Sequence, residues 1–261
     1  MSNISDRAYI DPKAKIGNNV NIMPFAYIEG DVEIGDNCVI YPHVSVMNGT
    51  RMGKNNCVHQ GTVLGAIPQD FNYCGRPTKL TIGDGNIIRE NVVIARSSYD
   101  EEGAATVIGN ENFLMEGVHV SHDDHIGNEN VFGYGTKLAG NVTVEDHVIM
   151  SSSIITNAGC RIGRYSMIGA NSYFSKDVPP YIICYGDPIV FGGVNKTILR
   201  KAGVSEKILD HVANAYRLVF NGQNDIMDVC NQIVQQVPAG EEIDNIVHFL
   251  ATSELGLITK L

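Results

Sequence analysis

Three of the eight histidines lie close together, in the segment 115–127. His119, His122 and His125 are spaced by three, and Asp123 directly follows His122. A neutral histidine whose tautomer is fixed by a neighbouring carboxylate can remove the proton of an attacking hydroxyl. An N–H group beside the imidazole would stabilise the oxyanion that develops during acyl transfer. The segment is therefore a candidate site for general-base catalysis of acyl transfer.

Two other interpretations of these histidines stay open. They could be solvated polar side chains on a strand, or they could be zinc ligands. The spacing of three residues favours neither of these two interpretations. The ligands of one zinc ion would have to come from different turns of the fold or from different chains. No Ser-His-Asp or Cys-His arrangement is discernible in the sequence, which disfavours a covalent acyl-enzyme.

A six-residue repeat must position these residues. Counting in sixes from Ile10, ten consecutive positions up to Leu64 are aliphatic or Met, and the repeat continues with two interruptions to Phe174. Of its 25 positions only Thr156 is polar. An α-helix cannot use this period, because 3.6 residues per turn would spread the aliphatic residues around its whole surface. The repeat therefore predicts a mainly β fold, a parallel β-helix of hexapeptide repeats.

A coil of three short strands, one hexad per side, buries every aliphatic residue inside a triangular prism. Glycines that directly follow the aliphatic residue, such as Gly17 and Gly35, are expected near corners, where unusual φ and ψ angles are needed. The two interruptions, 65–79 and 98–106, are expected to be loops extruded from corners.

The length of one coil brings the candidate residues together. Three hexads make 18 residues, so Gly140 is expected to stack directly above His122, and Asn141 above Asp123. The backbone N–H of Gly140 would then lie about one strand spacing, ~4.8 Å, from the imidazole. This stacking predicts an oxyanion-binding N–H beside the candidate base.

Residues 1–187 are assigned to the β-helix and residues 188–261 to a C-terminal helical domain. The paired prolines within 175–181 are expected to end strand pairing, and the period beyond them is helical. Ser205 is expected to cap the first of three amphipathic helices. Five basic and two acidic residues between 196 and 217 predict a docking surface for an anionic partner, with a solvated helix face as the alternative.

Composition excludes several classes of protein. The chain has 261 residues, 44% of them hydrophobic, which excludes a disordered chain. A net charge of −10 argues against non-specific nucleic-acid binding, and no apolar run approaches the roughly 18 residues of a membrane span. No secretory signal is visible at the N-terminus. The six cysteines contain no CxxC pair, so we expect reduced, mostly buried thiols in a cytoplasmic protein.

Five segments are more specific than the repeat: GAIPQDFNYCGRPT at 65–78, IGDGNIIREN at 82–91, LMEGVHVSHD at 114–123, KDVPPYII at 176–183 and HVANAYRLVF at 211–220. With these segments the chain resembles, over essentially its whole length, the acyl-carrier-protein-dependent UDP-N-acetylglucosamine O-acyltransferases. The resemblance implies a left-handed β-helix and a homotrimer with active sites between neighbouring prisms. It implies no metal and no cofactor other than the acyl-acyl carrier protein as co-substrate.

The resemblance also implies the reaction, in which a 3-hydroxyacyl chain moves from acyl carrier protein to the 3-hydroxyl of UDP-N-acetylglucosamine, the first step of lipid A biosynthesis. In it His122 would be the general base, Asp123 its orienting partner, and the Gly140 N–H the oxyanion donor. Asp70 and His119 would bind the sugar. The other substrate-binding positions that it implies are Gln69, Asn72, Asn157, Asn195, Arg200 and Lys201.

The chain departs from the family pattern at several positions. Asn72 replaces a usual Lys, Ala95–Ser98 replaces a basic-Gly-Thr element, Asn141 replaces a frequent His, Asn157-Ala158 replaces a His-Gln pair, and Ile198–Ala202 replaces a Gly-Leu-Arg-Arg-Arg run. These departures leave open a paralogue that acylates a different UDP-amino sugar, with a hydroxyl or an amine acceptor, or that uses another acyl donor. A non-catalytic trimeric binding protein and a zinc hydratase are further alternatives.

Overall fold

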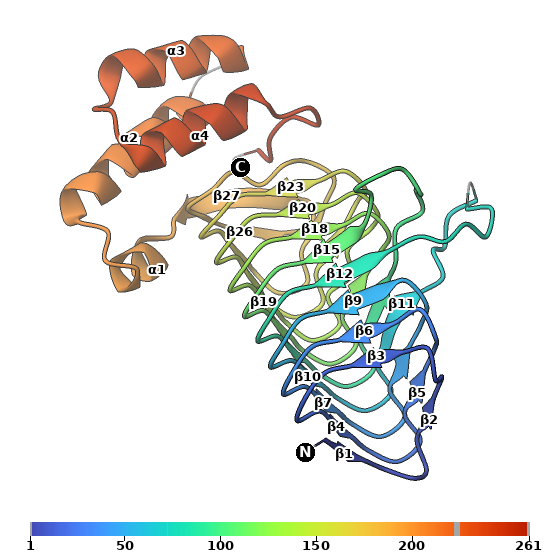
Figure 1. Ribbon diagram of the computed structural model, residues 1–261. Helices are drawn as coiled ribbons and strands as arrows, with labels where there is room; N and C mark the ends of the chain where they lie inside the picture. Colours follow the sequence, from blue (N-terminus) through green and yellow to red (C-terminus); the bar gives the residue numbers. More distant parts are fainter. Residues whose placement is uncertain (1, 72, 222–224, 260–261) are drawn as a thin grey trace.

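The computed structural model describes residues 2–71, 73–221 and 225–259, and its strands coil into a tapering prism with helices at one end (Figure 1). Each coil contributes one short strand to each of three faces, which we call A, B and C in the order in which the chain visits them. Neighbouring coils pair in parallel, in the register that the repeat predicts, for example Ile22 with Ile40 and Ile28 with Val46. The predicted parallel β-helix is therefore confirmed.

Face A is an eleven-stranded sheet. Its strands are β1 (Asn3–Ile4), β4 (Asn21–Ile22), β7 (Val39–Ile40), β10 (Cys57–Val58), β13 (Ile87–Ile88), β16 (Phe113–Leu114), β19 (Val131–Phe132), β21 (Ile149–Met150), β24 (Met167–Ile168), β26 (Ile182–Gly186) and β27 (Ile189–Val194). Face B comprises β2 (Tyr9–Ile10), β5 (Tyr27–Ile28), β8 (Ser45–Val46), β11 (Val63–Ala66), β14 (Val93–Ala95), β17 (His119–Val120), β22 (Ile155–Thr156) and β25 (Tyr173–Phe174). Single bridges at Lys137 join β17 to β22. Face C comprises β3 (Lys15–Ile16), β6 (Glu33–Ile34), β9 (Thr50–Met52), β12 (Leu80–Ile82), β15 (Thr106–Ile108), β18 (His125–Ile126), β20 (Thr143–Val144) and β23 (Arg161–Ile162).

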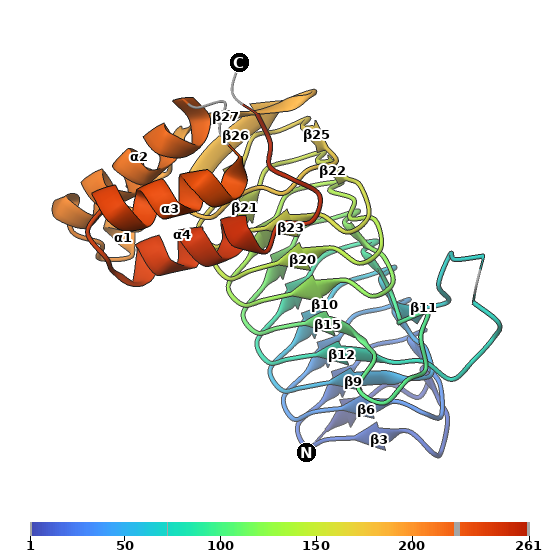
Figure 2. The same cartoon turned by 90° about the horizontal axis from the view of Figure 1, so that it is seen from above.

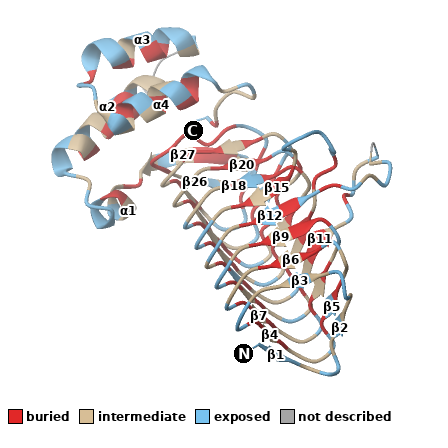
Figure 3. Ribbon diagram, in the orientation of Figure 1, coloured by how far each residue is buried: buried red, intermediate tan, exposed pale blue. Residues whose placement is uncertain are grey.

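The last residue of nearly every strand in the prism points into its interior. From Ile22 to Phe174 every residue at the aliphatic position of the repeat is buried, including the polar Thr156. Only Ile10 and Ile16, at the open N-terminal end, are half-buried (Figure 3). The repeat thus identifies the core residue by residue, because a period of six matches three straight sides per coil.

Backbone strain at the corners falls on a different residue than the sequence predicted. The left-handed conformation is adopted by the third residue after the aliphatic one, as at Asn19 (φ 55°), Asn37 (φ 60°) and Asn55 (φ 58°). Gly17 and Gly35 do not have positive φ angles, so that expectation was wrong. They are glycines because coils approach closely there: a Cβ on Gly35 would lie 2.6 Å from the carbonyl carbon of Gly53.

A ladder of buried asparagines ties successive coils together at the corner between faces C and A. Asn56, Asn86, Asn112 and Asn130 are each at most 1% exposed. The side-chain oxygen of Asn56 accepts the backbone N–H of Asn86 at 2.8 Å, and the Asn86 oxygen accepts that of Asn112 at 2.9 Å. Because each of these side-chain oxygens accepts a backbone N–H of the next coil, the ladder fixes the register; the Asn130 Nδ2 alone among these amides has no hydrogen-bond partner among the described residues.

Both interruptions of the repeat leave from the corner between faces B and C, the B–C corner. One loop connects β11 to β12 and the other connects β14 to β15. Figures 1 and 2 show both loops projecting on the same side of the prism. The strands on either side keep their register, since Cys57 pairs with Ile87 across the first loop and Ile87 with Phe113 across the second.

Strand pairing does not end at the prolines, contrary to the prediction for 175–181. Val178 forms a bridge with Ile162, and β26 pairs in parallel with β24 through Ile183 and Met167. The chain tolerates the prolines because they precede β26, in the bend where no ladder N–H is required.

The boundary expected between 187 and 188 falls in the turn of an antiparallel hairpin, β26–β27, so the helical part begins at Lys196. Its helices are α1 (Lys196–Lys201), α2 (Glu206–Asn221), α3 (Ile226–Gln236) and α4 (Glu241–Ala251). The Ser205 hydroxyl accepts the N–H of Ile208 at 3.4 Å, as expected for a cap of α2. The short α1 was not anticipated. Across the described residues, no helix is both long and apolar enough to traverse a bilayer.

Candidate active site

His122 lies in the turn from β17 to β18, at the B–C corner from which both loops project. Asp123 occupies the left-handed position of that turn, with φ of 63°, and its backbone N–H donates to the Thr106 hydroxyl at 2.8 Å. This corner geometry places two consecutive polar side chains outside the prism. The fold therefore builds the site on a rigid turn rather than on a free loop.

The imidazole of His122 has a different neighbour at each nitrogen. Its Nδ1 lies 2.8 Å from Oδ2 of Asp123, and its Nε2 lies 3.7 Å from Oδ2 of Asp70. An ionised carboxylate accepts the proton on Nδ1, so Nε2 carries the lone pair. Nε2 is the atom that can take a proton from a bound hydroxyl.

The carboxylate of Asp123 is held by two serines from the preceding coil. Ser97 Oγ donates to Oδ1, and Ser98 Oγ donates to Oδ2 at 2.7 Å. The backbone N–H of Ser98 adds a contact of 3.2 Å to Oδ1. Burial by itself would raise the pKa of Asp123, but hydrogen bonds from Ser97, Ser98 and His122 outweigh it and hold that pKa below its ordinary value. Asp123 is therefore an anion beside the imidazole.

Gly140 stacks on His122, as the 18-residue coil predicts. A Cβ on Gly140 would lie 2.7 Å from Cε1 and 2.9 Å from Nε2 of the imidazole. The next residue, Asn141, donates its N–H to the His122 carbonyl at 3.1 Å. No described residue accepts the Gly140 N–H in a hydrogen bond. The missing side chain of Gly140 thus lets the imidazole pack against the backbone of a residue whose N–H is not used by any described acceptor.

The two loops are joined to each other beside the site. Arg96 donates to the Gly65 carbonyl at 2.9 Å and to the Tyr73 hydroxyl at 2.9 Å. Arg76, on the first loop, donates to the Ser98 carbonyl at 3.2 Å and pairs with Asp100 at 3.0 Å. The loop that carries Asp70 is therefore fixed to the segment that carries the serines.

His119 and Lys137 lie on the outer side of face B next to the corner. They pair across adjacent coils, and Lys137 is exposed. Burial, together with the positive charge of Lys137, lowers the pKa of His119. A neutral His119 beside a cation suits the binding of a polar, anionic ligand rather than proton transfer.

The remaining predicted positions near this corner are less enclosed. Gln69 is exposed on the first loop, and Asn72 lies outside the described residues. Asn157 is exposed one coil beyond Gly140 and accepts the Tyr173 hydroxyl at 3.0 Å. Gln69 and Asn157 are thus free to contact a ligand that enters the corner from solvent.

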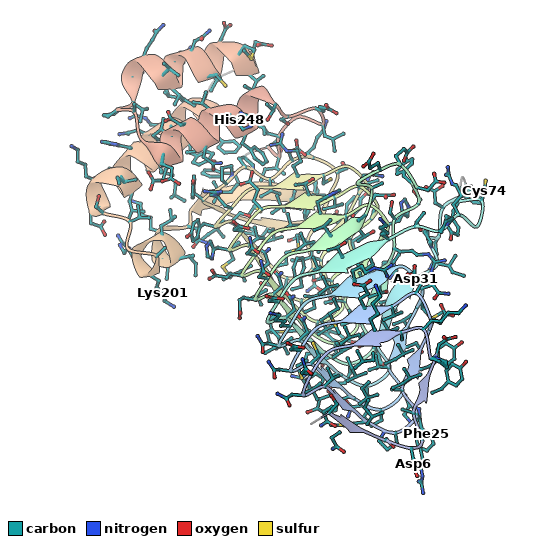
Figure 4. All side chains as sticks on the ribbon, in the orientation of Figure 1. Asp6, Phe25, Asp31, Cys74, Lys201 and His248 are labelled. Carbon is teal, nitrogen blue, oxygen red and sulfur yellow. The ribbon has the colours of Figure 1, made fainter. Side chains whose placement is uncertain are left out.

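Asn195, Arg200 and Lys201 lie elsewhere on the molecule. Lys201 and Ile198 of α1 line a groove of about 360 Å³ against the corner between faces C and A, with Glu129 and His147. Figure 4 shows Lys201 on the opposite side of the prism from Cys74, at the tip of the first loop. Within one chain these predicted substrate-binding residues do not meet His122.

The polar groups of Asn195 and Arg200 are also engaged. Asn195 is buried, and its amide donates to the Tyr165 carbonyl at 2.9 Å. Arg200 forms a two-pronged ion pair with Glu206, at 2.5 and 3.0 Å. Among the five basic residues between 196 and 217, Lys201, Lys207 and Arg217 form no ion pair with a described residue.

A Cys-His arrangement, not discernible in the sequence, does exist in the structure. Cys57 Sγ lies 3.5 Å from Nε2 of His59, whose Nδ1 lies 3.4 Å from Glu90. Burial raises the pKa of the Cys57 thiol, which does not favour a nucleophilic thiolate. None of the six cysteines forms a disulfide, and four of them are buried. In the described part of the chain, no three His, Cys, Asp or Glu side chains converge as metal ligands.

Curated relatives match the chain from end to end. The acyl-[acyl-carrier-protein]–UDP-N-acetylglucosamine O-acyltransferase of Halorhodospira halophila is 38% identical over 99% of this chain and 100% of its own length. That of Alkalilimnicola ehrlichii is 40% identical over 99% of this chain and 100% of its own length. The chain belongs to this O-acyltransferase family. The family description "Udp N-acetylglucosamine O-acyltransferase; Domain 2" matches residues 177–258, and "Bacterial transferase hexapeptide (six repeats)" matches residues 13–46.

Solved structures of O-acyltransferases of this family share the fold. The UDP-N-acetylglucosamine acyltransferase of Bacteroides fragilis superposes with a TM-score of 0.94 at 44% identity, covering 98% of this chain and 99% of that one. The structure from Acinetobacter baumannii gives a TM-score of 0.95 at 35% identity, with 98% and 99% coverage. The left-handed parallel β-helix with a helical C-terminal end is thereby confirmed.

The contacts of Ser97, Ser98 and Thr106 with Asp123 were missed by reasoning from the sequence, in which Ala95–Ser98 stood out only as a departure from the family pattern. A signal existed, because Ser97 is the third residue after Ile94, as Asp123 is the third after Val120. Ile94 and Val120 pair across neighbouring coils, 26 residues apart rather than 18. The inserted loop hid this stacking from a count in steps of 18.

Proposed function

We propose that the chain is an acyltransferase that moves a 3-hydroxyacyl chain from acyl carrier protein to the 3-hydroxyl of UDP-N-acetylglucosamine, the first step of lipid A biosynthesis. The observation that carries the proposal is the His122 imidazole, bound to Asp123 through Nδ1 and in contact with Gly140 on its other side. Membership of the O-acyltransferase family favours this reaction over the alternative acceptors and donors.

The chemistry is one direct substitution at a thioester. Nε2 of His122 takes the proton of the sugar hydroxyl as its oxygen bonds to the thioester carbonyl carbon. The carbonyl oxygen becomes an oxyanion and accepts the N–H of Gly140. When the tetrahedral intermediate collapses, the carbon–sulfur bond breaks and the imidazolium returns its proton to the departing thiolate. The products are an ester of the sugar and the free thiol of the carrier protein, with no covalent enzyme intermediate.

The binding roles follow from the positions around the base. Asp70 lies 3.7 Å from Nε2, so its carboxylate would orient the sugar hydroxyls, with His119 on the adjoining face. Gln69 and Asn157 border the same corner. Asn72 belongs to the same loop as Gln69 and is proposed to bind substrate with it. No separate cofactor and no metal take part in this scheme; the acyl carrier protein is a co-substrate.

Part of the site must come from another chain if Asn195, Arg200 and Lys201 contact the substrate. Helix α1, which carries Arg200 and Lys201, lies on the far side of the prism from the projecting loops (Figure 2), and Asn195 directly precedes it. A homotrimer, in which α1 of one protomer faces the B–C corner of the next, would bring them to the nucleotide or to the acidic carrier protein. Lys201, Lys207 and Arg217 would meet that partner. Six cysteines outside disulfides fit a cytoplasmic location.

An assay with acyl-acyl carrier protein and UDP-N-acetylglucosamine tests the reaction, with the acylated sugar detected by mass spectrometry. His122→Ala should lower kcat by about 10²–10⁴-fold, the contribution of a general base. His59→Ala is the matched control, because His59 also pairs with a carboxylate but lies on another corner. Equal rates for His122→Ala and the wild type would overturn the proposed mechanism.

The trimer is tested by mixing inactive variants. Light scattering should give three times the 28.4 kDa mass of one chain. If sites lie between protomers, co-refolded His122→Ala and Lys201→Ala chains should regain activity, since some interfaces then combine one intact His122 with one intact Lys201. A monomeric mass would refute the proposed assembly while leaving the chemistry at His122 to the assay above.

A further inference from the structure

The outer turn at Ala95–Ser98 contains two hydroxyls that the mechanism above does not use. Ser97 and Ser98 lie where the second loop leaves the B–C corner, directly before Tyr99. Pairing of Ile94 with Val120 places Ser97 in the coil next to Asp123, at the same position of the hexad. The two serines therefore approach the carboxylate from the neighbouring coil.

We propose that Ser97 and Ser98 are positioning residues for acyl transfer, which act through Asp123 by fixing its carboxylate beneath the His122 imidazole. The inference rests on the proposed general-base role of His122. Neither serine touches the reacting atoms in this proposal. Their effect is on the orientation and the basicity of the group that orients the base.

The hydrogen bonds to Asp123 account for both of its carboxylate oxygens. Oδ1 accepts the Ser97 hydroxyl and the Ser98 N–H at 3.2 Å. Oδ2 accepts the Ser98 hydroxyl at 2.7 Å and the His122 Nδ1 at 2.8 Å. With four donors on two oxygens, the carboxylate plane can rotate only by breaking bonds. The hydrogen bond from Nδ1 then fixes the orientation of the imidazole as well.

Burial makes these bonds effective. Ser97 is 0% exposed, Ser98 2% and Asp123 7%. Because water cannot replace a lost donor freely at this depth, removal of either hydroxyl leaves the carboxylate under-satisfied. A free carboxylate oxygen would be more basic and would hold the imidazolium form of His122 more strongly.

The charged and titratable neighbours of this carboxylate come from three segments. Asp124 and His125 follow it in the same turn, and the His125 Nδ1 lies 3.2 Å from the Asp123 carbonyl. Asp70 faces the other side of His122 from the first loop, and Arg76 donates to the Ser98 carbonyl. None of these groups donates to the Asp123 carboxylate in the described structure, so the serines and His122 are its only side-chain donors there.

The test measures kcat, KM for UDP-N-acetylglucosamine, and the pH profile of kcat/KM for Ser97→Ala, Ser98→Ala and the double variant. The double variant should lose about 10–100-fold in kcat, as expected when a base is misplaced, with KM little changed. Its acid limb should move to higher pH, because a more basic Asp123 favours protonated His122. Ser98→Thr keeps the hydroxyl, so both kcat and the acid limb should stay at their wild-type values.

Ser172→Ala is the matched control for loss of a buried hydroxyl. Ser172 is 1% exposed, donates to the Gly169 carbonyl at 2.8 Å and accepts the Gly186 N–H at 3.0 Å, away from the site. It should lower the melting temperature without moving the acid limb. If the double variant keeps the wild-type kcat and acid limb while His122→Ala is inactive, the positioning role is refuted and the proposed function stands. If His122→Ala stays active, the proposed function itself fails.

Discussion

His59 and His122 lie on two corners of the prism, each next to a carboxylate, but their surroundings differ; on the third corner His147 lies next to Glu129. His59 is stacked on Tyr41 with ring centroids 4.5 Å apart, and both of its nitrogens have neighbours, Glu90 and Cys57. His122 has one nitrogen bound to Asp123 and the other turned toward Asp70 at 3.7 Å. A histidine–carboxylate pair alone therefore does not identify a catalytic base. His122 differs from His59 in that its carboxylate is held by buried hydroxyls and its second nitrogen faces a carboxylate at 3.7 Å rather than a thiol.

The carboxylates differ in the same way. Glu90 is bound by Arg89, a partly exposed partner, at 2.9 Å. Asp123 is bound by neutral, buried hydroxyls. Arg89 places a positive charge beside Glu90, and its hydrogen bond is the main cause of the lowered pKa of that carboxyl. The serines orient Asp123 without placing a positive charge beside it.

Exchange of each carboxylate for its amide gives the largest expected difference between the two corners. Asp123→Asn should lower kcat by about 10²–10⁴-fold, because an amide N–H can donate to Nδ1 and leave the proton on Nε2, where the base must be free. Glu90→Gln should stay within about twofold of the wild type, the scatter expected for a group remote from chemistry. Steady-state acyl transfer measures both variants. Similar losses in the two variants would remove the distinction between the corners.

A methyl group on Gly140 should have the next largest effect. Its Cβ would overlap the imidazole at 2.7 Å from Cε1, so Gly140→Ala should displace the base and lower kcat by about 10–100-fold. Gly127→Ala is the control, since its Cβ would meet another side chain, Asp146 Oδ1, and no atom of His122 is among its nearest contacts. Kinetics and melting temperature are measured together. Wild-type turnover in a folded Gly140→Ala protein would contradict the stacking role.

The smallest expected effect is on stability at acid pH. Because the folded-state pKa of Asp123 lies below its ordinary value of 3.8, the ionised group stabilises the fold above that pH, and the contribution is lost as the pH falls through the folded value. The melting temperature of the wild type should therefore approach that of Asp123→Asn below about pH 4. For the half-buried Glu90, the difference between wild type and Glu90→Gln should be smaller and should decrease in high salt. A pH-independent difference at Asp123 would show that its charge does not stabilise the fold.

Much of this architecture follows from the sequence, because a period of six has one simple structural solution. The period predicted the buried residues from Ile22 to Phe174, and the 18-residue coil predicted the contact of Gly140 with His122. Both predictions follow from counting residues within the stretches of the repeat that the two loops do not interrupt.

The predictions that failed concern segments where the six-residue repeat is interrupted or ends. The second loop shifts the register to 26 residues, so Ser97 and Ser98 were not recognised beneath Asp123. The six residues of α1 are too few to show a helical period, and the end of strand pairing was placed too early because prolines are tolerated in a bend. The Arg200–Glu206 pair depends on side-chain geometry that charge counts do not contain.

The number of residues between paired strands differs along the prism, and this difference determines how easily residues can be inserted or deleted. Paired strands of face A are separated by 30 residues across the first loop and by 26 across the second, against 18 between the other neighbouring strands from β1 to β24, as the partners Cys57–Ile87, Ile87–Phe113 and Phe113–Val131 show. Closing 30 residues instead of 18 costs only about 0.5 kcal/mol in chain entropy. The corner that carries the chemistry can therefore gain or lose residues with little effect on folding, while the asparagine ladder on another corner keeps the coils aligned. Sequence drift in the two loops is a route to new acceptor preferences that leaves the scaffold intact.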